Sequence, residues 1–142
     1  MKVRTEARRN AILEVAALVF LEKGFEGASM SEIAQRVGGS RATLYGYFPS
    51  KQEVFLAVTH AQGEKHMQPA VSELAAQAPR ELQQALTRFS AKLVSFLASD
   101  ETCATDRMVI AEAGRSEIAR LFYEAGPKVG LLASFPPSPV GI

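Results

Sequence analysis

The sequence predicts an all-α protein: a three-helix head built around a helix-turn-helix, followed by a second helical domain that is shortened. Three observations carry this prediction. Helix start and stop signals recur closely between Ser29 and Lys51. Apolar residues elsewhere return every three or four positions, as on an amphipathic helix. Beyond Lys51 the chain keeps this helical pattern as far as Ala125.

The first helix is expected from about Thr5 to Lys23, where Gly24 ends it. Its buried side follows the helical spacing and consists of Ile12, Val15, Ala16, Val19 and Phe20. Three arginines lie near its start: Arg4, Arg8 and Arg9. Cations at this end oppose the helix dipole. Two interpretations stay open: nucleic-acid phosphates supply the missing negative charge, or this is an ordinary solvated terminus.

The second helix has a start signal and a stop signal. Ser29 and Glu32 form a capping box, in which the serine oxygen and the glutamate carboxylate each satisfy a free backbone N–H. A helix is therefore expected from Met30. Gly38 and Gly39 end it, because glycine tolerates the left-handed conformation that closes a helix.

A third helix follows directly. Ser40 caps its start, and it runs to about Phe48, since Pro49 prevents continuation. A further capping box beginning at Ser50 opens a fourth helix at Lys51. Two short helices joined by a tight glycine turn constitute a helix-turn-helix.

The faces of this third helix point to nucleic acid. At 100° per residue Leu44 and Phe48 share the core face, while Ala42 and Gly46 point away from it. Polar or cationic side chains border this small-residue ridge: Arg41 and Tyr45 on one flank, Ser40, Thr43 and Tyr47 on the other. Such a helix suits a major groove, with the flanking groups on phosphates. The alternative is that Gly46 shortens an exposed turn and the tyrosines cover apolar surface.

The remaining helices are predicted from periodicity and breakers. The fourth helix is interrupted near Gly63 and Pro69, which either kinks it as a hinge or ends it before a new helix from about Val71. Later helices are expected at residues 80–98, with Pro79 first, at about 100–113 and at about 116–125. The apolar side of the first of these is expected to be Leu82, Leu86, Phe89, Leu93 and Phe96.

Composition permits a nucleic-acid-binding head. Residues 1–51 hold eight Lys or Arg and five Glu, a charge of +3, whereas residues 52–142 hold eight and ten, a charge of −2. No apolar stretch is long enough to span a membrane and no signal peptide is visible, so a cytoplasmic protein is expected. Cys103 is alone, and His60 and His66 lack metal-ligand spacing. The sequence therefore indicates no cofactor, no metal site and no enzyme.

From about Glu6 to His66 the chain resembles the TetR-type transcriptional regulators. The matching positions are Gly24, Phe25, Ser29, Ile33, Ala34, Gly38, Thr43, Leu44, Tyr45, Tyr47, Phe48 and Lys51. The resemblance implies a DNA-binding domain over residues 6–66 with its motif at 29–48. It implies base contacts from Arg41 and Ala42 and phosphate contacts from Ser29, Thr43, Tyr45, Tyr47 and Lys51. Ser40 and Gly46 complete the candidate surface, although many relatives carry a larger side chain at the position of Gly46.

A second, narrower resemblance covers about Arg80 to Pro127, in the string DRMVIAEAGRSEIARLFYEAGP. It is similar to the regulatory domain of the AefR-like subgroup and implies a helical ligand-binding and dimerisation domain over residues 67–142. Five side chains are candidates for an apolar effector pocket: Met108, Ile110, Leu121, Phe122 and Tyr123. The alternative is that they are ordinary core residues.

The end of the chain departs from the resemblance. After Gly126 the amphipathic pattern gives way to three prolines in four positions. Similar proteins continue with two long helices that form the dimer. The expectation is that this chain is shortened and that it forms a homodimer if those helices are present.

Three functional hypotheses follow, of which the last, a small helical enzyme or accessory subunit with an accidental helix-turn-helix, is disfavoured by the combined face pattern from Ser40 to Lys51. The first is a sequence-specific repressor that binds an operator in double-stranded DNA and is released by a small apolar effector. The second is a truncated ligand-binding or dimer-partner protein with weak or no specific operator binding.

Overall fold

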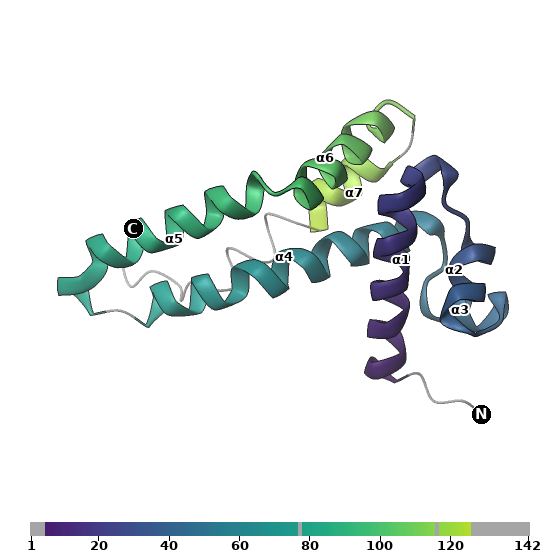
Figure 1. Cartoon of the computed structure of the whole chain (residues 1–142), viewed down its shortest axis with the longest axis horizontal. Coiled ribbons are helices and arrows are strands. Elements are labelled where there is room, and N and C mark those ends of the chain that lie inside the picture. Colours follow the sequence, from purple (N-terminus) through teal and green to yellow (C-terminus); the bar gives the residue numbers. More distant parts are fainter. Residues whose placement is uncertain (1–4, 77, 116, 126–142) are drawn as a thin grey trace, which may run out of the picture. The chain divides into compact units, whose positions relative to one another are not determined.

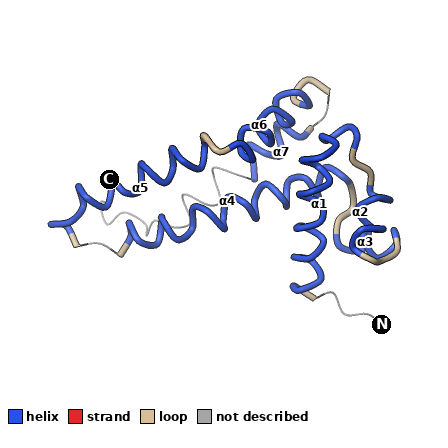
Figure 2. The backbone as a smooth tube through the Cα atoms, in the orientation of Figure 1, coloured by secondary structure: helices blue, strands red, loops and turns tan. Residues whose placement is uncertain are grey.

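The computed structural model describes residues 5–76, 78–115 and 117–125, and all regular structure within them is helical (Figures 1 and 2). The elements in chain order are α1 (Glu6–Gly27), α2 (Met30–Val37), α3 (Arg41–Tyr47), α4 (Lys51–Ala75), a 3₁₀ turn (Pro79–Glu81), α5 (Leu82–Leu97), α6 (Asp100–Glu112) and α7 (Ile118–Ala125). The predicted all-α class is confirmed. Two compact units meet within α4, Met1–Ala61 and Gln62–Ile142. The predicted domain boundary after His66 lies in the same helix and stays a prediction.

Helix α1 breaks where the sequence places its end. Thr5 caps the start through a hydrogen bond that its side chain accepts from Arg8 N. Gly24 has φ 70° and ψ 176°, a conformation that side chains other than hydrogen disfavour. Phe25 to Gly27 form one further turn beyond this break, so the helical segment ends four residues later than Lys23.

The buried side of α1 differs from the prediction at two positions. Ile12, Ala16, Val19 and Phe20 are buried as expected, but Leu13 is buried too and Val15 is only half-buried. Several helices contribute the remaining buried side chains, which include Phe25, Ile33, Leu44, Phe48, Val54, Phe55 and Val58. The wider apolar stripe is reasonable for a helix that contacts more than one neighbour.

The glycine turn between α2 and α3 is a helix terminus of the Schellman type. Gly38 is left-handed, with φ 78° and ψ 34°. Its N–H donates to Gln35 O at 3.1 Å, and the N–H of Gly39 donates to Ala34 O at 3.0 Å. These two bonds satisfy carbonyls that the end of α2 would leave without partners.

Serines cap the starts of α2, α3, α4 and α6. The Oγ atoms accept from backbone N–H groups three residues later: Ser29 from Glu32, Ser40 from Thr43, Ser50 from Glu53 and Ser99 from Thr102. The reciprocal half of the predicted box at Ser29 was wrong. The Glu32 carboxylate instead binds Lys23 and Arg36, each at 2.9 Å.

Helix α4 does not end at Pro69, contrary to one of the two expectations. It continues as helix to Ala75. Proline within a helix removes one backbone hydrogen bond and costs roughly 3 kcal/mol. The two residues that follow, Ala70 and Val71, are 2% and 7% exposed, and their burial favours continuation of the helix.

The predicted apolar side of α5 is only partly buried. Leu82 and Leu86 are 46% and 45% exposed, and the other three predicted positions are half-buried. Ala85 is the residue of α5 that is fully buried. Ion pairs join α5 to the end of α4: the Glu73 carboxylate binds Arg88 at 2.9 Å and Lys92 at 2.8 Å.

The last two described helices form a hairpin, with α7 packed on α6. Ser99 is the N-cap of α6, which begins at Asp100 as the sequence predicts. Ile118 at the start of α7 is completely buried. The predicted start at Ser116 lies outside the described residues.

We expect Gly38→Ala to destabilise the first unit by about 1–2 kcal/mol, because a β-carbon is strained in the left-handed conformation. Gly63→Ala is the matched control: its added Cβ meets nothing within 4 Å, and its backbone is not left-handed. Alanine there is expected to raise stability by up to about 1 kcal/mol. Urea unfolding followed by circular dichroism measures both; equal changes would contradict the assignment of strain to Gly38.

Candidate nucleic-acid interface

Helix α3 presents the residues that the sequence predicts for contact. Leu44 and Phe48 are 3% and 4% exposed and fix the buried side. The exposed residues are Ser40, Arg41, Ala42 and Tyr45, and the half-buried ones are Thr43, Gly46 and Tyr47. The structure therefore confirms the predicted division of this helix into a buried core face and an exposed outer face.

The hydroxyl groups at the start of α3 are linked to one another. Ser40 Oγ lies 2.9 Å from Thr43 Oγ1 and also accepts from the Thr43 N–H at 3.1 Å. Ser29 has the same capping arrangement at the start of α2 and is exposed. Because a hydroxyl that accepts a bond keeps its own O–H, Ser29 retains a donor for a phosphate oxygen, and the Ser40–Thr43 pair retains one between them.

Three arginines gather near α3 without acidic partners. Arg41 lies with its guanidinium carbon 5.9 Å from the Tyr45 ring centre, and Arg9 lies 5.4 Å from the Phe48 ring centre. Arg8 reaches the glycine turn, where a Cβ on Gly39 would be 2.8 Å from its Nη2. Within the described part of the chain, no ion pair involves any of these three arginines. Glycine at position 39 thus gives the Arg8 guanidinium room against the turn.

Other basic residues of the same unit are neutralised. Arg36 binds Glu22 at 2.7 Å and Glu32 at 2.9 Å, and Lys23 also binds Glu32. The hydrogen bond from Arg36 lowers the pKa of Glu22, and the one from Lys23 does most to lower the pKa of Glu32. The arginines of this unit that have no carboxylate partner among the described residues therefore lie on α3 and at the start of α1.

The Tyr47 side chain has a role that its sequence position does not indicate. Its hydroxyl accepts a 3.1 Å hydrogen bond from the Thr5 N–H. In a capping box the residue three places later returns such a bond, but here that residue is Arg8 rather than Glu. Tyr47 thus joins the end of α3 to the start of α1 and keeps its own O–H as a donor. Thr5 was not predicted as part of the interface. The sequence signal was the absence of a Glu three residues after Thr5, which leaves the Thr5 N–H to find another acceptor.

Lys51 is also engaged within the protein. Its ammonium donates to Phe25 O at 2.7 Å and to Ala28 O at 3.2 Å, and it lies 4.3 Å from the Phe25 ring centre. These carbonyls belong to the last turn and C-cap of α1, where a cation is favourable. The ammonium has three donors, so one remains for the predicted phosphate contact, which stays a prediction.

The five candidate effector residues are not brought together around a cavity in the described part of the second unit. Ile110 is 73% exposed, while Met108, Leu121 and Phe122 are half-buried. The Tyr123 side chain lies outside the described residues. A cavity that the structure does contain is lined by other residues of α4, α5 and the start of α6. The apolar-effector assignment stays a prediction.

Among the described residues, no group of three or more His, Cys, Asp or Glu side chains could hold a metal ion. None of the described helices is both long enough and apolar enough to cross a membrane.

Comparison with known proteins agrees with this geometry. Residues 12–58 match the family model described as "Bacterial regulatory proteins, tetR family". The chain belongs to the TetR family of bacterial regulatory proteins. Residues 84–133 match the model of the AefR-like transcriptional repressor C-terminal domain, which confirms the second resemblance.

Individual relatives extend the match along the chain. The HTH-type transcriptional regulator BetI of Rhizobium meliloti is 36% identical over 114 residues, which cover 80% of this chain and 55% of BetI. A TetR-family regulator from Mesorhizobium loti superposes with a TM-score of 0.72 at 29% identity, covering 94% of this chain and 66% of that one. The Flavonoid-responsive Regulator FrrA has a TM-score of 0.68 at 34% identity, covering 87% and 62%. The chain thus spans about half the length of BetI and under two thirds of FrrA.

We expect Lys51→Met to destabilise the first unit by about 1–3 kcal/mol, because two carbonyls lose a charged hydrogen-bond donor. Lys23→Met is the matched control, since that ammonium is 45% exposed and makes a surface ion pair. No measurable change is expected from it. Urea denaturation of both variants provides the comparison, and an unchanged midpoint for Lys51→Met would contradict its capping role.

Proposed function

We propose that this chain acts as a sequence-specific DNA-binding transcriptional regulator, a repressor that a small molecule releases from its operator. The observation that supports it most is the exposed α3 with three arginines that no carboxylate neutralises in the described residues. Paired arginines would gain little from DNA, because binding would have to compete with their carboxylates. Arginines without carboxylate partners release counterions when they meet phosphates, and this drives association.

The proposed contacts divide into two groups. Arg41 and Ala42 lie at the exposed N-terminal end of α3 and are assigned to base edges, with Gly46 allowing close approach of the backbone. Hydroxyl donors from Ser29, Ser40, Thr43, Tyr45 and Tyr47, together with Lys51, are assigned to phosphates. Arg8 and Arg9 are also assigned to phosphate contacts. This assignment follows the interpretation in which nucleic-acid phosphates supply the negative charge at the basic start of α1.

The repressor and effector parts of the proposal draw on the relatives. The C-terminal model that matches here is named for a transcriptional repressor, and FrrA is named as flavonoid-responsive. By analogy, an effector would bind the second unit and shift the protein away from its DNA-binding state. Such a shift is limited by the difference in effector affinity between the two states.

We expect Arg41→Ala to weaken binding to a selected DNA site by roughly 1–3 kcal/mol and to affect random DNA much less, because a base contact is lost. The site would first be obtained by selection from random duplexes, and binding measured by fluorescence anisotropy. Equal loss on selected and random DNA would show that Arg41 reads no base.

Arg8→Ala and Arg36→Ala provide the controls for this measurement. Arg8→Ala is expected to weaken both DNAs alike and to reduce the salt slope of binding by about one. Arg36→Ala should leave that slope unchanged, because Glu22 and Glu32 already neutralise Arg36. A salt slope that falls equally in both variants would contradict the proposed charge distribution.

The regulator is proposed to act as a homodimer that places two copies of α3 in successive major grooves about 34 Å apart. Light scattering on the complex with a selected palindromic site is expected to give two chains per duplex. A single chain per duplex, with no preference for the palindrome over one half-site, would favour the alternative of a ligand-binding or partner protein without operator function.

A further inference from the structure

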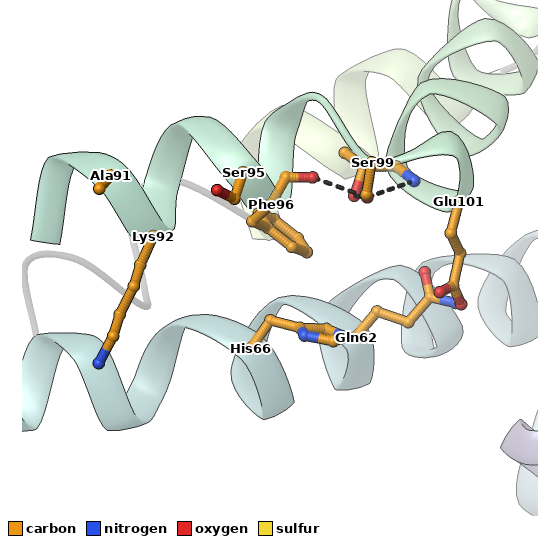
Figure 3. A pocket seen from close by; sticks show the side chains of 9 residues that line it. Gln62, His66, Ala91, Lys92, Ser95, Phe96, Ser99 and Glu101 are labelled. Carbon is orange, nitrogen blue, oxygen red and sulfur yellow. Dashed lines mark hydrogen bonds between the residues drawn. The ribbon is translucent and has the colours of Figure 1, made fainter. Parts of the chain in front are cut away.

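An open cavity of about 430 Å³, most of whose lining residues are exposed to solvent, lies within the second unit (Figure 3). Its size falls in the range of sites for drug-sized molecules. The lining residues are Gln62 and His66 of α4, Ala91, Lys92, Ser95 and Phe96 of α5, and Ser99, Glu101 and Thr102 around the start of α6. Both sides of the cavity therefore belong to the same compact unit.

The space exists because small side chains recur along α5. Ala91, Ser95 and Ser99 follow one another at four-residue intervals, so they lie on one face of the helix and its capping turn. Helices with side chains of ordinary length pack 8–10 Å apart and fill the gap between them. Here the short side chains leave a gap that the longer residues of α4 do not close.

Two aromatic rings form one side of the cavity. The rings of His66 and Phe96 stack with centroids 5.5 Å apart and an angle of 29° between their planes. Figure 3 shows both rings between the two helices. A stacked pair of this kind offers an aromatic surface to a further planar ring.

The polar groups of the cavity leave one negative charge without a cation. The Lys92 ammonium shares the Glu73 carboxylate with Arg88, at 2.8 Å and 2.9 Å, so this cation belongs to an ion-pair cluster. Glu101 accepts a hydrogen bond from the Gln62 amide through Oε1, and no described cation pairs with it. Its second oxygen is available as an acceptor, and the Ser95 hydroxyl makes no hydrogen bond in the described structure.

We infer that this cavity is the effector site of the proposed regulator and that it takes an uncharged, planar aromatic molecule carrying a hydroxyl group. The ring stacks on the His66–Phe96 pair, and the hydroxyl donates to Glu101. An anionic group in the place of this hydroxyl is disfavoured, because its charge would lie beside the Glu101 carboxylate. The inference rests on the proposed function, and it replaces the apolar set around Ile110 with a polar-rimmed aromatic site.

The test uses the full chain and two fluorescent ligands that share one ring system, 2-naphthol and 2-naphthoate. Titration of ligand fluorescence measures affinity without DNA, so a failure of operator binding does not affect this result. We expect 2-naphthol to bind about tenfold or more tightly than 2-naphthoate, and Glu101→Gln to reduce this preference several-fold. Equal binding of the two ligands to the unmodified chain would overturn the inference.

A cavity-filling variant locates the site. Ser95→Phe is expected to lower 2-naphthol affinity about tenfold or more, because the added ring occupies the space beside Phe96. Ser90→Phe is the matched control on the same helix: Ser90 is exposed and does not line the cavity. Circular dichroism checks that both variants fold. Unchanged binding in Ser95→Phe, or the same loss in Ser90→Phe, would place the ligand elsewhere.

The effector role is read separately, by anisotropy of the selected DNA site with and without saturating 2-naphthol. Reduced DNA affinity in the unmodified chain, and no reduction in Ser95→Phe, is the expected result. Ligand binding with no change in DNA affinity would overturn the effector assignment. Loss of DNA binding in the absence of any ligand would count against the proposed function instead.

Discussion

The DNA-binding unit depends on one junction, where the end of α1 meets the start of α4. Phe20, Phe25 and Phe55 pack there with ring centroids 5.1 to 6.0 Å apart. Lys51 lies over the Phe25 ring and binds the last carbonyls of α1. Because α2 and α3 are the segment between these two helices, the junction closes the loop that contains them. Edge-to-face aromatic contacts and a half-buried cation depend on orientation, so together they fix how the end of α1 is oriented against the start of α4 more specifically than apolar burial alone would.

The same unit separates charge by choosing which arginines have partners. Arg36 is bound by two carboxylates, whereas Arg8, Arg9 and Arg41 lie against rings or glycine. Aromatic and glycine neighbours hold a guanidinium in place without cancelling its charge. The unit therefore presents positive charge at α3 although the excess of basic over acidic residues in residues 1–61 is only two, eight against six. Positioning of charge, rather than its total, is what a phosphate backbone responds to.

Local signals in the sequence were sufficient for the helix-turn-helix, because each depends on residues a few positions apart. The serine caps, the left-handed Gly38 and the buried pair Leu44 and Phe48 all follow from spacing and backbone preference. The bonds of Tyr47 to Thr5 and of Lys51 to Phe25 join residues 42 and 26 positions apart, and no local pattern encodes them. Tyr47 and Lys51 are also predicted to contact phosphates, so each would combine a structural role with a DNA contact.

The second unit was less predictable for a related reason. Periodicity gives α5 an apolar side, yet the section of α4 in this unit supplies the polar Gln62, His66 and Glu73 as well as the buried Ala70 and Val71. The two helices are consequently joined by ion pairs at one end and by a ring pair near the other, with small residues between them. Exposed ion pairs contribute little to stability. They join the ends of long side chains and do not fill the space between the two helix backbones. A seam of this kind leaves volume between its helices, which accounts for the cavity and for its polar rim. The cavity is thus a consequence of how α4 and α5 are joined.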